Sequence, residues 1–520
     1  MADAPPTLVD RLHLHGCSLG DAPALSDPAH SVTWAQLDAQ TNRIANALAG
    51  AGIGAGARVA LMVGADVAGV LWLLGVLKAG ASVVPVPGLV GDEAVLRILS
   101  DCQAGALLVS ERYRRLVTPR VANMPIPRIA IDFEAEGYLS AGAFLDGADE
   151  TAPEAAVRPR DEFNIIYSSG TTGRPKGIVH SHALRAAWSI GVSELAFPAG
   201  VRTLTTTSLY SNWTLCALVY TLWNGGHAHL MERFSPGALV EACQGFAPDN
   251  VYLVPVQVAR LLDDPTAVAQ LAALPPSTKW CAGSRMPVEH KREILRLWPG
   301  GLIEVYGMTE GAPSTLLLAH ERPDKLHTVG SSDVPDGIKI IDEDGLELGV
   351  GRVGEVVGRA VDVTDGYHND PEATAALIWR DAAGDPFLRS GDIGCLDEEG
   401  FLQILDRKKD MIISGGFNVY AADLEEVLAG HPEVAEAAVF AIPSAQWGET
   451  PAAAVTLRDS AGVQGHDLRD WANQRLGRVQ RLAAVVVVER LPRGALGKVL
   501  KRELRERFHT LNPEHASFDE

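Results

Sequence analysis

Hydroxyl, glycine and lysine side chains crowd into residues 167–177, where together they could bind a phosphate chain. The stretch reads Tyr-Ser-Ser-Gly-Thr-Thr-Gly-Arg-Pro-Lys-Gly and follows an apolar run that predicts a strand. Glycine lets backbone N–H groups approach an anion, hydroxyls donate to phosphate oxygens, and lysine supplies charge. The common G-x-x-x-x-G-K-[ST] pattern is absent because Arg174 and Pro175 separate Gly173 from Lys176. An ordinary Gly/Ser surface turn is the alternative, and motifs further along the chain favour a triphosphate loop.

The bulk properties set limits on the fold and on the partners. The chain has 520 residues, and single cores stop growing near about 250–300 residues, so we expect two or more domains. The composition is 47% hydrophobic and 21% charged, which is typical of globular proteins. The net charge of −20 argues against nucleic acid as a partner, whereas a small anionic ligand needs only local positive charge.

The cysteines and the apolar segments bear on the cellular compartment in which the protein is expected. The six cysteines are scattered and form no Cys-x-x-Cys pair, so neither a zinc site nor a disulfide framework is predicted. The first residues do not show the pattern of a signal peptide. The most apolar window, residues 67–86, could be a lone membrane span, but Lys78 and Gly80 interrupt it and favour a buried helix followed by a buried strand. We expect a cytoplasmic protein without integral membrane association.

The pattern of expected helices and strands changes twice along the chain. Residues 59–63 and 81–86 are expected to be strands around a helix at 67–77, and similar alternation recurs near 251–262 and 303–306. Such alternation predicts parallel sheets with helices on their faces. After about residue 329, short strands with Asp/Gly turns predict a small β-rich subdomain, a barrel being one form of it. The charge run 406–410 could be a solvated turn or a domain junction, and a compact α+β domain is expected after it.

Further motifs follow the phosphate loop in a fixed order. They are Tyr306-Gly307-Met308-Thr309-Glu310 after a strand, Ser390-Gly391-Asp392 in the β-rich region, Asp406 to Asp410 at the junction, and Pro492 to Lys498 near the end. With the loop, they resemble the adenylate-forming superfamily, which includes acyl-CoA synthetases, adenylation domains of peptide synthetases, and luciferases. The resemblance spans nearly the whole chain and is strongest to bacterial aryl- or fatty-acyl-CoA ligases.

The resemblance implies an α/β fold in two moving parts. A large N-terminal AMP-binding domain, residues 1–405, would comprise two αβαβα-type subdomains and a small β-barrel subdomain. Residues 406–410 would form a hinge, and residues 411–520 a small mobile α+β domain that carries a catalytic lysine. In the family, this small domain rotates between the two half-reactions. Some members dimerise, and nothing in the sequence decides whether this chain is a homodimer.

The nucleotide contacts carry over by position. The phosphate-binding residues would be Ser168, Ser169, Gly170, Thr171, Thr172, Gly173 and Lys176. Thr309 and Glu310 match residues that contact the α-phosphate and hold Mg²⁺, with Thr171 as a second metal contact. A carboxylate plus substrate phosphates is a usual magnesium environment. Tyr306 matches the aromatic residue that stacks on adenine, and Gly283 and Ser284 match the backbone strip along the edge of the base. Gly307 is a further expected nucleotide contact.

Ribose and catalytic contacts come from the C-terminal half of the chain. Asp392 matches the carboxylate that accepts hydrogen bonds from both ribose hydroxyls, a role that suits an acceptor-only group. Arg407 matches a ribose and phosphate contact. Lys498 matches the lysine that bridges the substrate carboxylate and the α-phosphate, where a fixed ammonium stabilises developing charge. Lys409 occupies the hinge position.

Four residues match contacts to coenzyme A. Gly415 and Gly416 would line the tunnel for the pantetheine arm, although a turn alone would also explain two glycines. Trp447 matches an aromatic residue that stacks on the CoA adenine, with core packing as the alternative. Arg481 falls where aryl-CoA ligases place a basic CoA contact. CoA is therefore favoured over a carrier protein as the acceptor.

The acyl pocket is the least regular part of the resemblance. Its expected lining is Tyr210, Asn212, Trp213, Val254, Met308 and Pro313. No aspartate stands in residues 209–213 to pair with an α-amine, so an amino acid substrate is disfavoured. Ser211 stands where many members have histidine. Asn212 could bind a ring hydroxyl or simply cap a helix.

These features together predict an AMP-forming acyl-CoA synthetase. It would use ATP and Mg²⁺ to convert an aryl, arylalkanoic or medium- to long-chain acid to an acyl adenylate, and then form a thioester with CoA. One alternative is a stand-alone adenylating enzyme that loads a carrier protein. A non-catalytic nucleotide sensor on the same fold is a second alternative, and Lys498, Glu310 and Asp392 argue against it.

Overall fold

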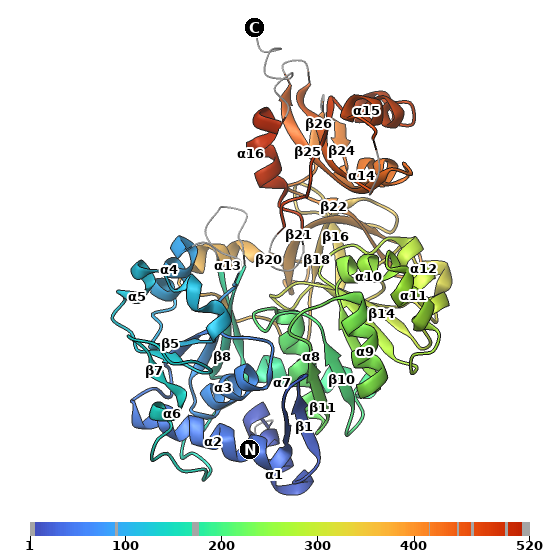
Figure 1. Cartoon of the computed structure of the whole chain (residues 1–520). Coiled ribbons are helices and arrows are strands. Elements are labelled where there is room, and N and C mark those ends of the chain that lie inside the picture. The colour runs from blue at the N-terminus through green and yellow to red at the C-terminus, as the bar shows by residue number, and fades with distance from the viewer. Residues whose placement is uncertain are drawn as a thin grey trace. The chain divides into compact units, whose positions relative to one another are not determined.

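The computed structural model describes residues 6–88, 92–168, 176–414, 417–444, 447–458, 462–493 and 498–511. The chain forms two compact units (Figure 1). The first unit contains Met1–Gly337 and Arg359–Leu388, and the second contains Ile338–Gly358 and Arg389–Glu520. The hinge expected at 406–410 stays a prediction.

The first sheet of the first unit carries the phosphate-loop hairpin. Its strand order is β19 (Gly366–Tyr367), β9 (Lys176–Ser181), β8 (Glu162–Ser168), β4 (Ser82–Pro85), β3 (Arg58–Met62), β5 (Ala106–Val109), β6 (Arg128–Ala130) and β7 (Leu139–Ser140). The strands from β8 to β7 run parallel, whereas β9 pairs antiparallel with both β8 and β19. The two-residue strand β19 is thus brought beside the hairpin from a distant part of the sequence.

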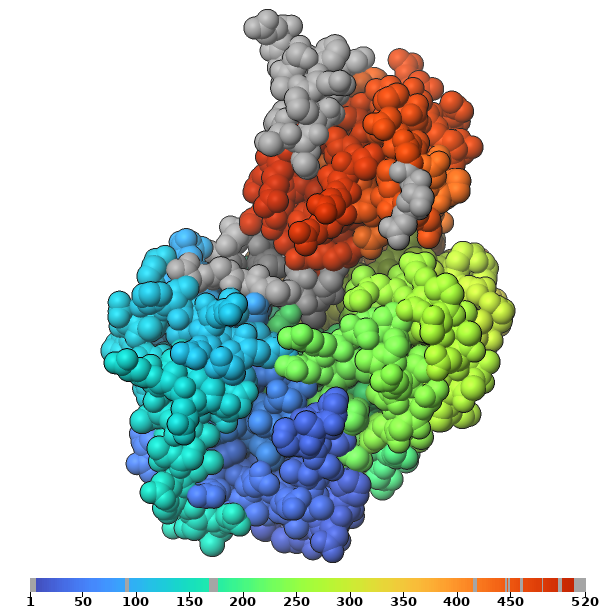
Figure 2. Space-filling model, viewed as in Figure 1, coloured from blue at the N-terminus to red at the C-terminus, as the bar shows by residue number. Residues whose placement is uncertain are grey.

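The second sheet has the same mixed character. Its order is β15 (Ser314–Leu318), β14 (Leu302–Gly307), β13 (Thr278–Ala282), β12 (Asn250–Leu253), β10 (Arg202–Thr205), β11 (His227–Leu230), β1 (Pro23–Ser26) and β2 (Ser31–Thr33). The six strands from β14 to β1 are parallel. Figure 2 shows the N-terminal segments in blue adjoining the green segments around residues 200–250, as the pairing of β1 with β11 requires.

Helices of the first unit cover these sheets. They include α1 (Leu8–Leu19), α2 (Trp34–Gly50), α3 (Val67–Lys78), α4 (Asp92–Asp101), α7 (His182–Ala196), α8 (Asn212–Trp223), α9 (Pro236–Phe246), α10 (Pro255–Leu262), α12 (Val288–Leu297) and α13 (Pro371–Leu377). Strands followed by helices agree with the expected alternation, so the predicted α/β class is confirmed.

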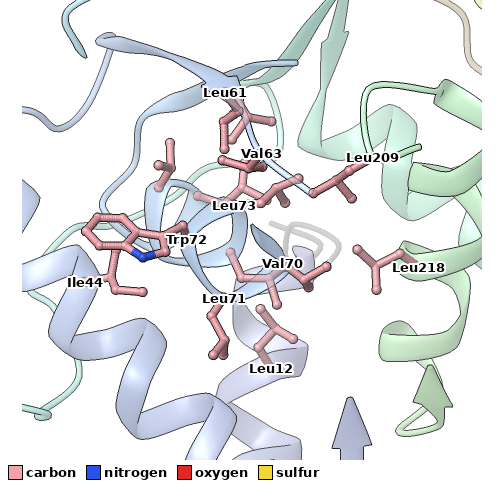
Figure 3. Packing of buried hydrophobic residues seen from close by; sticks show 14 of the residues in the cluster. Leu12, Ile44, Leu61, Val63, Val70, Leu71, Trp72, Leu73, Leu209 and Leu218 are labelled. Atoms are coloured by element: carbon pink, nitrogen blue, oxygen red, sulfur yellow. The ribbon is translucent and has the colours of Figure 1, made fainter. Parts of the chain in front are cut away.

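Helix α3 is the centre of the main core. It is buried on nearly every side, from Val67 to Lys78, which explains why its sequence lacks a polar face. Figure 3 shows Val70, Leu71, Trp72 and Leu73 of α3 among residues of α1, α2 and α8. The buried Lys78 Nζ donates to Asp38 Oδ1 at 2.5 Å and to Asn42 Oδ1 at 2.8 Å.

The interpretation of the apolar window at residues 67–86 as a buried helix and a buried strand is confirmed. In the described ranges, no helix is both long enough and apolar enough to cross a bilayer.

The second unit contains two antiparallel-rich sheets. One comprises β17 (Glu347–Leu348), β16 (Ile338–Ile341), β18 (Gly354–Gly358), the later part of β21 (Pro386–Leu396), and β22 (Leu402–Arg407), and it forms the expected β-rich region. The other comprises β24 (Phe417–Val419), β23 (Ile412–Ser414), β26 (Gly448–Leu457), β25 (Val434–Ser444) and β27 (Ala484–Val487). Helices α14 (Ala421–Ala429), α15 (Gly465–Asn473) and α16 (Lys501–Leu511) accompany it, giving the expected α+β composition.

Candidate active site

The phosphate loop connects the two strands of the β8–β9 hairpin. Ser168 ends β8, Lys176 begins β9, and the two residues are direct antiparallel partners. The predicted phosphate contacts Ser169, Gly170, Thr171, Thr172 and Gly173 lie outside the described residues. The Lys176 ammonium lies over the Tyr367 ring, 4.6 Å from its centroid. Strand β19 therefore supplies a platform for the only cation of the predicted loop contacts.

Tyr367 also reaches the predicted metal residue. Its hydroxyl donates to Glu310 Oε1 at 2.7 Å, and Glu310 is only 9% exposed. Burial and the Glu310 carboxylate raise the pKa of the Tyr367 phenol, so the hydroxyl stays protonated and remains the donor. Lys176, Tyr367 and Glu310 thus form one connected group, with the cation over the phenol ring and the carboxylate at the phenol hydroxyl.

A second hydrogen bond joins the same two regions. His180, on β9, contacts the Thr309 carbonyl oxygen through Nε2 at 2.7 Å. The segment after β14, which contains the predicted α-phosphate contacts, is therefore held by one bond to β9 of the phosphate-loop hairpin and by another to the adjoining strand β19. These bonds bring one edge of the first sheet to the second sheet.

The predicted adenine contacts lie at the carboxyl ends of two neighbouring strands. Gly283 and Ser284 follow β13, while Tyr306 and Gly307 end β14, and Ala282 pairs with Val305 across the two strands. Gly283 has φ of +103°, a backbone conformation that side-chain-bearing residues rarely adopt. In parallel sheets, ligands characteristically bind beyond the carboxyl ends of the strands.

The expected acyl-pocket residues converge on the same edge. Tyr210, Asn212 and Trp213 follow β10, Val254 follows β12, and Met308 and Pro313 follow β14. Since β10, β12, β13 and β14 are successive neighbours, these segments emerge side by side. The Trp213 indole is fixed by an Nε1 bond of 3.0 Å to the Leu253 carbonyl and by contact with Tyr252 at 4.5 Å between ring centroids.

Asn212 does not cap helix α8. The N-cap is Ser211, whose hydroxyl accepts from the Trp213 backbone N–H at 3.2 Å. The Asn212 side-chain oxygen instead accepts a hydrogen bond of 2.8 Å from Arg185 Nη2. The alternative that Asn212 serves as a helix cap is therefore wrong.

The predicted ribose contacts form an ion pair in the second unit. Asp392 on β21 and Arg407 on β22 are cross-strand partners, with 2.6 Å between Arg407 Nε and Asp392 Oδ1. The Asp392 side chain is 3% exposed and that of Arg407 40% exposed. Ser390 Oγ accepts from the Asp392 N–H at 2.9 Å and donates to the Val356 carbonyl at 2.7 Å, which explains the conformation of the Ser-Gly-Asp turn.

Lys498 lies within the field of this pair. Its pKa is lowered to about 8, chiefly by desolvation and also by the nearby positive charges of Arg407 and Lys409, while the carboxylates of Asp392 and Asp410 oppose the shift. The residue nevertheless keeps substantial exposed surface, so solvent screens part of this effect. Lys409, the predicted hinge residue, is exposed.

Two of the four predicted CoA contacts, Trp447 and Arg481, lie among the described residues. Gly415 and Gly416 lie outside the described residues. Trp447 is half-buried, and its backbone N–H donates to Ser444 Oγ at 3.2 Å. Arg481 is exposed just before β27. Their roles stay predictions.

Comparison with known proteins settles the family. Residues 17–368 match the family described as AMP-binding enzyme, and residues 423–498 match the AMP-binding enzyme C-terminal domain.

This chain belongs to the AMP-binding enzyme family.

Curated family members are similar over almost their whole length. A feruloyl-CoA synthase of Amycolatopsis is 31% identical, over 94% of this chain and 96% of that protein. A long-chain-fatty-acid–CoA ligase of Mycobacterium tuberculosis is 32% identical, over 93% and 94%. The resemblance to adenylate-forming enzymes inferred from the motifs is confirmed.

Solved structures of the family share the fold. ATP-bound MatB from Rhodopseudomonas palustris aligns with a TM-score of 0.84 at 25% identity, covering 96% of this chain and 99% of that one. The o-succinylbenzoate CoA synthetase of Bacillus subtilis, in complex with its acyl-adenylate intermediate, aligns with a TM-score of 0.82 at 26% identity, covering 95% and 97%.

The donor set at Glu310 fits a magnesium ion that is shared with a nucleotide. Within the described ranges, no cluster of three or more His, Cys, Asp or Glu side chains could hold a metal by itself. A family member that binds MgATP does not need one, since Mg²⁺ typically takes one or two carboxylates together with substrate phosphates and water. Glu310, which accepts a hydrogen bond from Tyr367, would supply such a carboxylate.

The role of Tyr367 is not evident from the sequence. A Gly-Tyr pair before Asn369-Asp370-Pro371 indicates little more than a turn and a helix start. No local signal shows that these two residues add a strand to β9, which places the phenol beside Glu310. The roles of Arg185 and His180 are not evident from the sequence either, because they arise from the burial of these side chains, which the sequence does not reveal.

Proposed function

We propose that this protein is an AMP-forming acid–CoA ligase that activates a hydrophobic carboxylic acid of the aryl, arylalkanoic or medium- to long-chain class. Family membership supports the ligase chemistry. Relatives named for feruloyl-CoA, long-chain fatty acids and indoleacetate support this range of acids.

The observation that carries the proposal is the pair of hydrogen bonds from β9 of the phosphate-loop hairpin and from its neighbouring strand β19 to the segment after β14. Tyr367 to Glu310 and His180 to Thr309 bring the candidate phosphate-binding residues to the strand edge where the candidate acyl and adenine residues emerge. A carboxylate and an α-phosphate bound there would be neighbours, which is the requirement for joining them.

The reaction proceeds in two steps. A carboxylate oxygen of the acid attacks the α-phosphorus of ATP, the bond to pyrophosphate breaks, and an acyl adenylate forms. The CoA sulfur then attacks the acyl carbonyl carbon, and AMP leaves as the thiol proton passes to solvent. The first step brings two anions together, so fixed cations must lower their repulsion.

The residues of this chain have separate tasks in that chemistry. Lys176 and the loop residues hold the β- and γ-phosphates, and Asp392 with Arg407 holds the ribose. Lys498 contributes an ammonium to the acid carboxylate and the α-phosphate. Glu310 and Thr171 would hold Mg²⁺, which neutralises phosphate charge. Trp447, Arg481, Gly415 and Gly416 bind CoA after the hinge at Lys409 has moved.

The test is acid-dependent pyrophosphate release, measured over aryl, arylalkanoic and fatty acids with and without CoA. We expect release of pyrophosphate and AMP with at least one class, and acyl-CoA formation when CoA is present. Absence of AMP with every acid would overturn the proposal. Adenylation without acyl-CoA formation would point to a carrier protein as the acceptor and overturn the CoA part.

A further inference from the structure

Arg185 is a fully buried cation beside the candidate acyl pocket. It lies in the first turn of α7 and is 1% exposed. Its Nη2 donates to Asn164 Oδ1 at 2.7 Å and to Asn212 Oδ1 at 2.8 Å, and it contacts His180 Nδ1 at 3.0 Å. The guanidinium is thus buried and hydrogen-bonded to residues of β8, β9 and α8, rather than exposed to solvent.

No carboxylate compensates this charge in the part of the chain that the structure describes. Among the described residues, every hydrogen-bond partner of Arg185 is neutral, including Cys216 Sγ at 3.5 Å, and the rings of Phe163 and Trp188 lie close to the guanidinium. Arginine stays protonated in proteins, and buried charges are normally paired because desolvation is costly. A positive charge retained here therefore calls for an anionic or strongly accepting partner that is not part of the protein.

Arginine fixes the orientation of the Asn212 amide. A guanidinium only donates, so the atom that faces Arg185 must be the amide oxygen, and the amide nitrogen must point away from it. Asn212 is half-buried, and its nitrogen has no hydrogen-bond acceptor among the residues that are described. Asn212 therefore presents an N–H donor at the edge where the candidate acyl pocket lies.

The hydrogen bonds of His180 determine which of its ring nitrogens carries the proton. The Thr309 carbonyl can only accept, so His180 Nε2 carries the proton and Nδ1 is an acceptor, which faces Asn164 Nδ2 at 3.1 Å and Arg185 Nη2 at 3.0 Å. Burial and the Arg185 charge both lower the pKa of His180 well below its usual range, which keeps the ring neutral. Arg185 thus contacts Asn212 on one side and, on the other, the histidine that is bonded to Thr309.

We propose that Asn212, oriented by Arg185, selects carboxylic acids that carry a second oxygen acceptor away from the reacting carboxylate. The acceptor is a hydroxyl, carbonyl or second carboxylate oxygen, and an anionic oxygen gains additionally from the uncompensated guanidinium. Asn212 would contact the substrate, whereas Arg185 is a positioning residue. This inference rests on the proposed adenylation of acids and specifies which acids are preferred.

Two pairs of acids of matched length test it. They are 3-(4-hydroxyphenyl)propionate against 3-phenylpropionate, and octanedioate against octanoate. For the acceptor-bearing member of at least one pair, we expect kcat/KM for adenylation to be higher by about tenfold or more, since an unpaired buried donor is costly. Adenylation of both members at equal kcat/KM in both pairs would overturn the inference but leave the proposed function intact. Absence of adenylation with all four acids and the wider panel would overturn the proposed function itself.

Asn212→Asp is the sharpest variant because it removes the donor and gives Arg185 a carboxylate partner. We expect the preference to fall by about tenfold while the thermal unfolding midpoint stays level or rises. Asn224→Asp, at the other end of α8, is the matched control and should keep the preference. An unchanged preference in Asn212→Asp would contradict the inference.

Arg185→Met tests the positioning role. We expect it to reduce the ratio of kcat/KM between octanedioate and octanoate. A purely structural role would lower both values equally and leave the ratio unchanged, which would contradict our assignment of Arg185. If Arg185→Met does not fold, the Asn212→Asp ratio decides the question.

Discussion

Removing one hydroxyl from Tyr367 should weaken the use of MgATP without dismantling the site. Tyr367→Phe deletes the hydrogen bond of 2.7 Å to Glu310 but keeps the ring beneath Lys176. Partners that orient a metal-binding carboxylate typically contribute about 10–100-fold in metal affinity or activity. Glu310 is 9% exposed, so little water can replace the phenol. We therefore expect kcat/KM for MgATP to fall by about 10- to 100-fold, equivalent to about 1.4–2.7 kcal/mol.

The assay is pyrophosphate release as a function of free Mg²⁺ at fixed ATP, together with thermal unfolding. The Mg²⁺ midpoint should rise in Tyr367→Phe, and unfolding should move by no more than one lost hydrogen bond, about 1 kcal/mol. Tyr138→Phe is the matched control, because Tyr138 makes an edge-to-face contact with Phe133, at 5.1 Å between ring centroids, and belongs to neither β19 nor the segment after β14. An unchanged Mg²⁺ midpoint with an altered stability would refute the reasoning and leave Tyr367 a structural residue.

Three further predictions concern the second unit. Lys498 must be an ammonium, and its pKa is lowered to about 8, so kcat/KM for adenylation should decline as pH rises through about 8. The Lys498→Ala variant should lose adenylation yet still convert supplied acyl adenylate to thioester. Equal loss of both steps would contradict this role of Lys498. Lys409→Pro restricts the backbone at the expected hinge and should slow thioester formation more than adenylation, so equal partial rates would count against rotation. Trp447→Ala should raise KM for CoA by about tenfold but not KM for ATP, and a matched rise in both would argue against stacking.

Much of the fold could be predicted from the sequence because local sequence patterns and the tertiary structure agree. The apolar runs at β3, α3 and β4 have the period and breakers of buried strands and a buried helix, and they fold as such. The glycine-rich motif fell between two strands, as a phosphate loop should. The Ser-Gly-Asp motif lies on β21, where a cross-strand partner, Arg407, meets the carboxylate.

Other features could not be read from the sequence. Tyr367 became a candidate only when β19 was found beside β9, about 190 residues earlier in the chain. Asn212 looked equally suited to a cap or a substrate contact, and the hydroxyl of Ser211 decided against the cap. Arg185 resembled any helix-surface arginine, since burial is a property of the assembled layers and not of a residue type.

The sequence by itself determined the family, the α/β class and the order of the motifs, because each motif is a short segment whose backbone chemistry is local. Only the tertiary structure decided which side chains face one another and which charges lack a counter-ion. Strands β8, β9 and β19 with helices α7 and α8 meet through long-range packing, and that packing alone places a cation with neutral partners next to the candidate acid pocket.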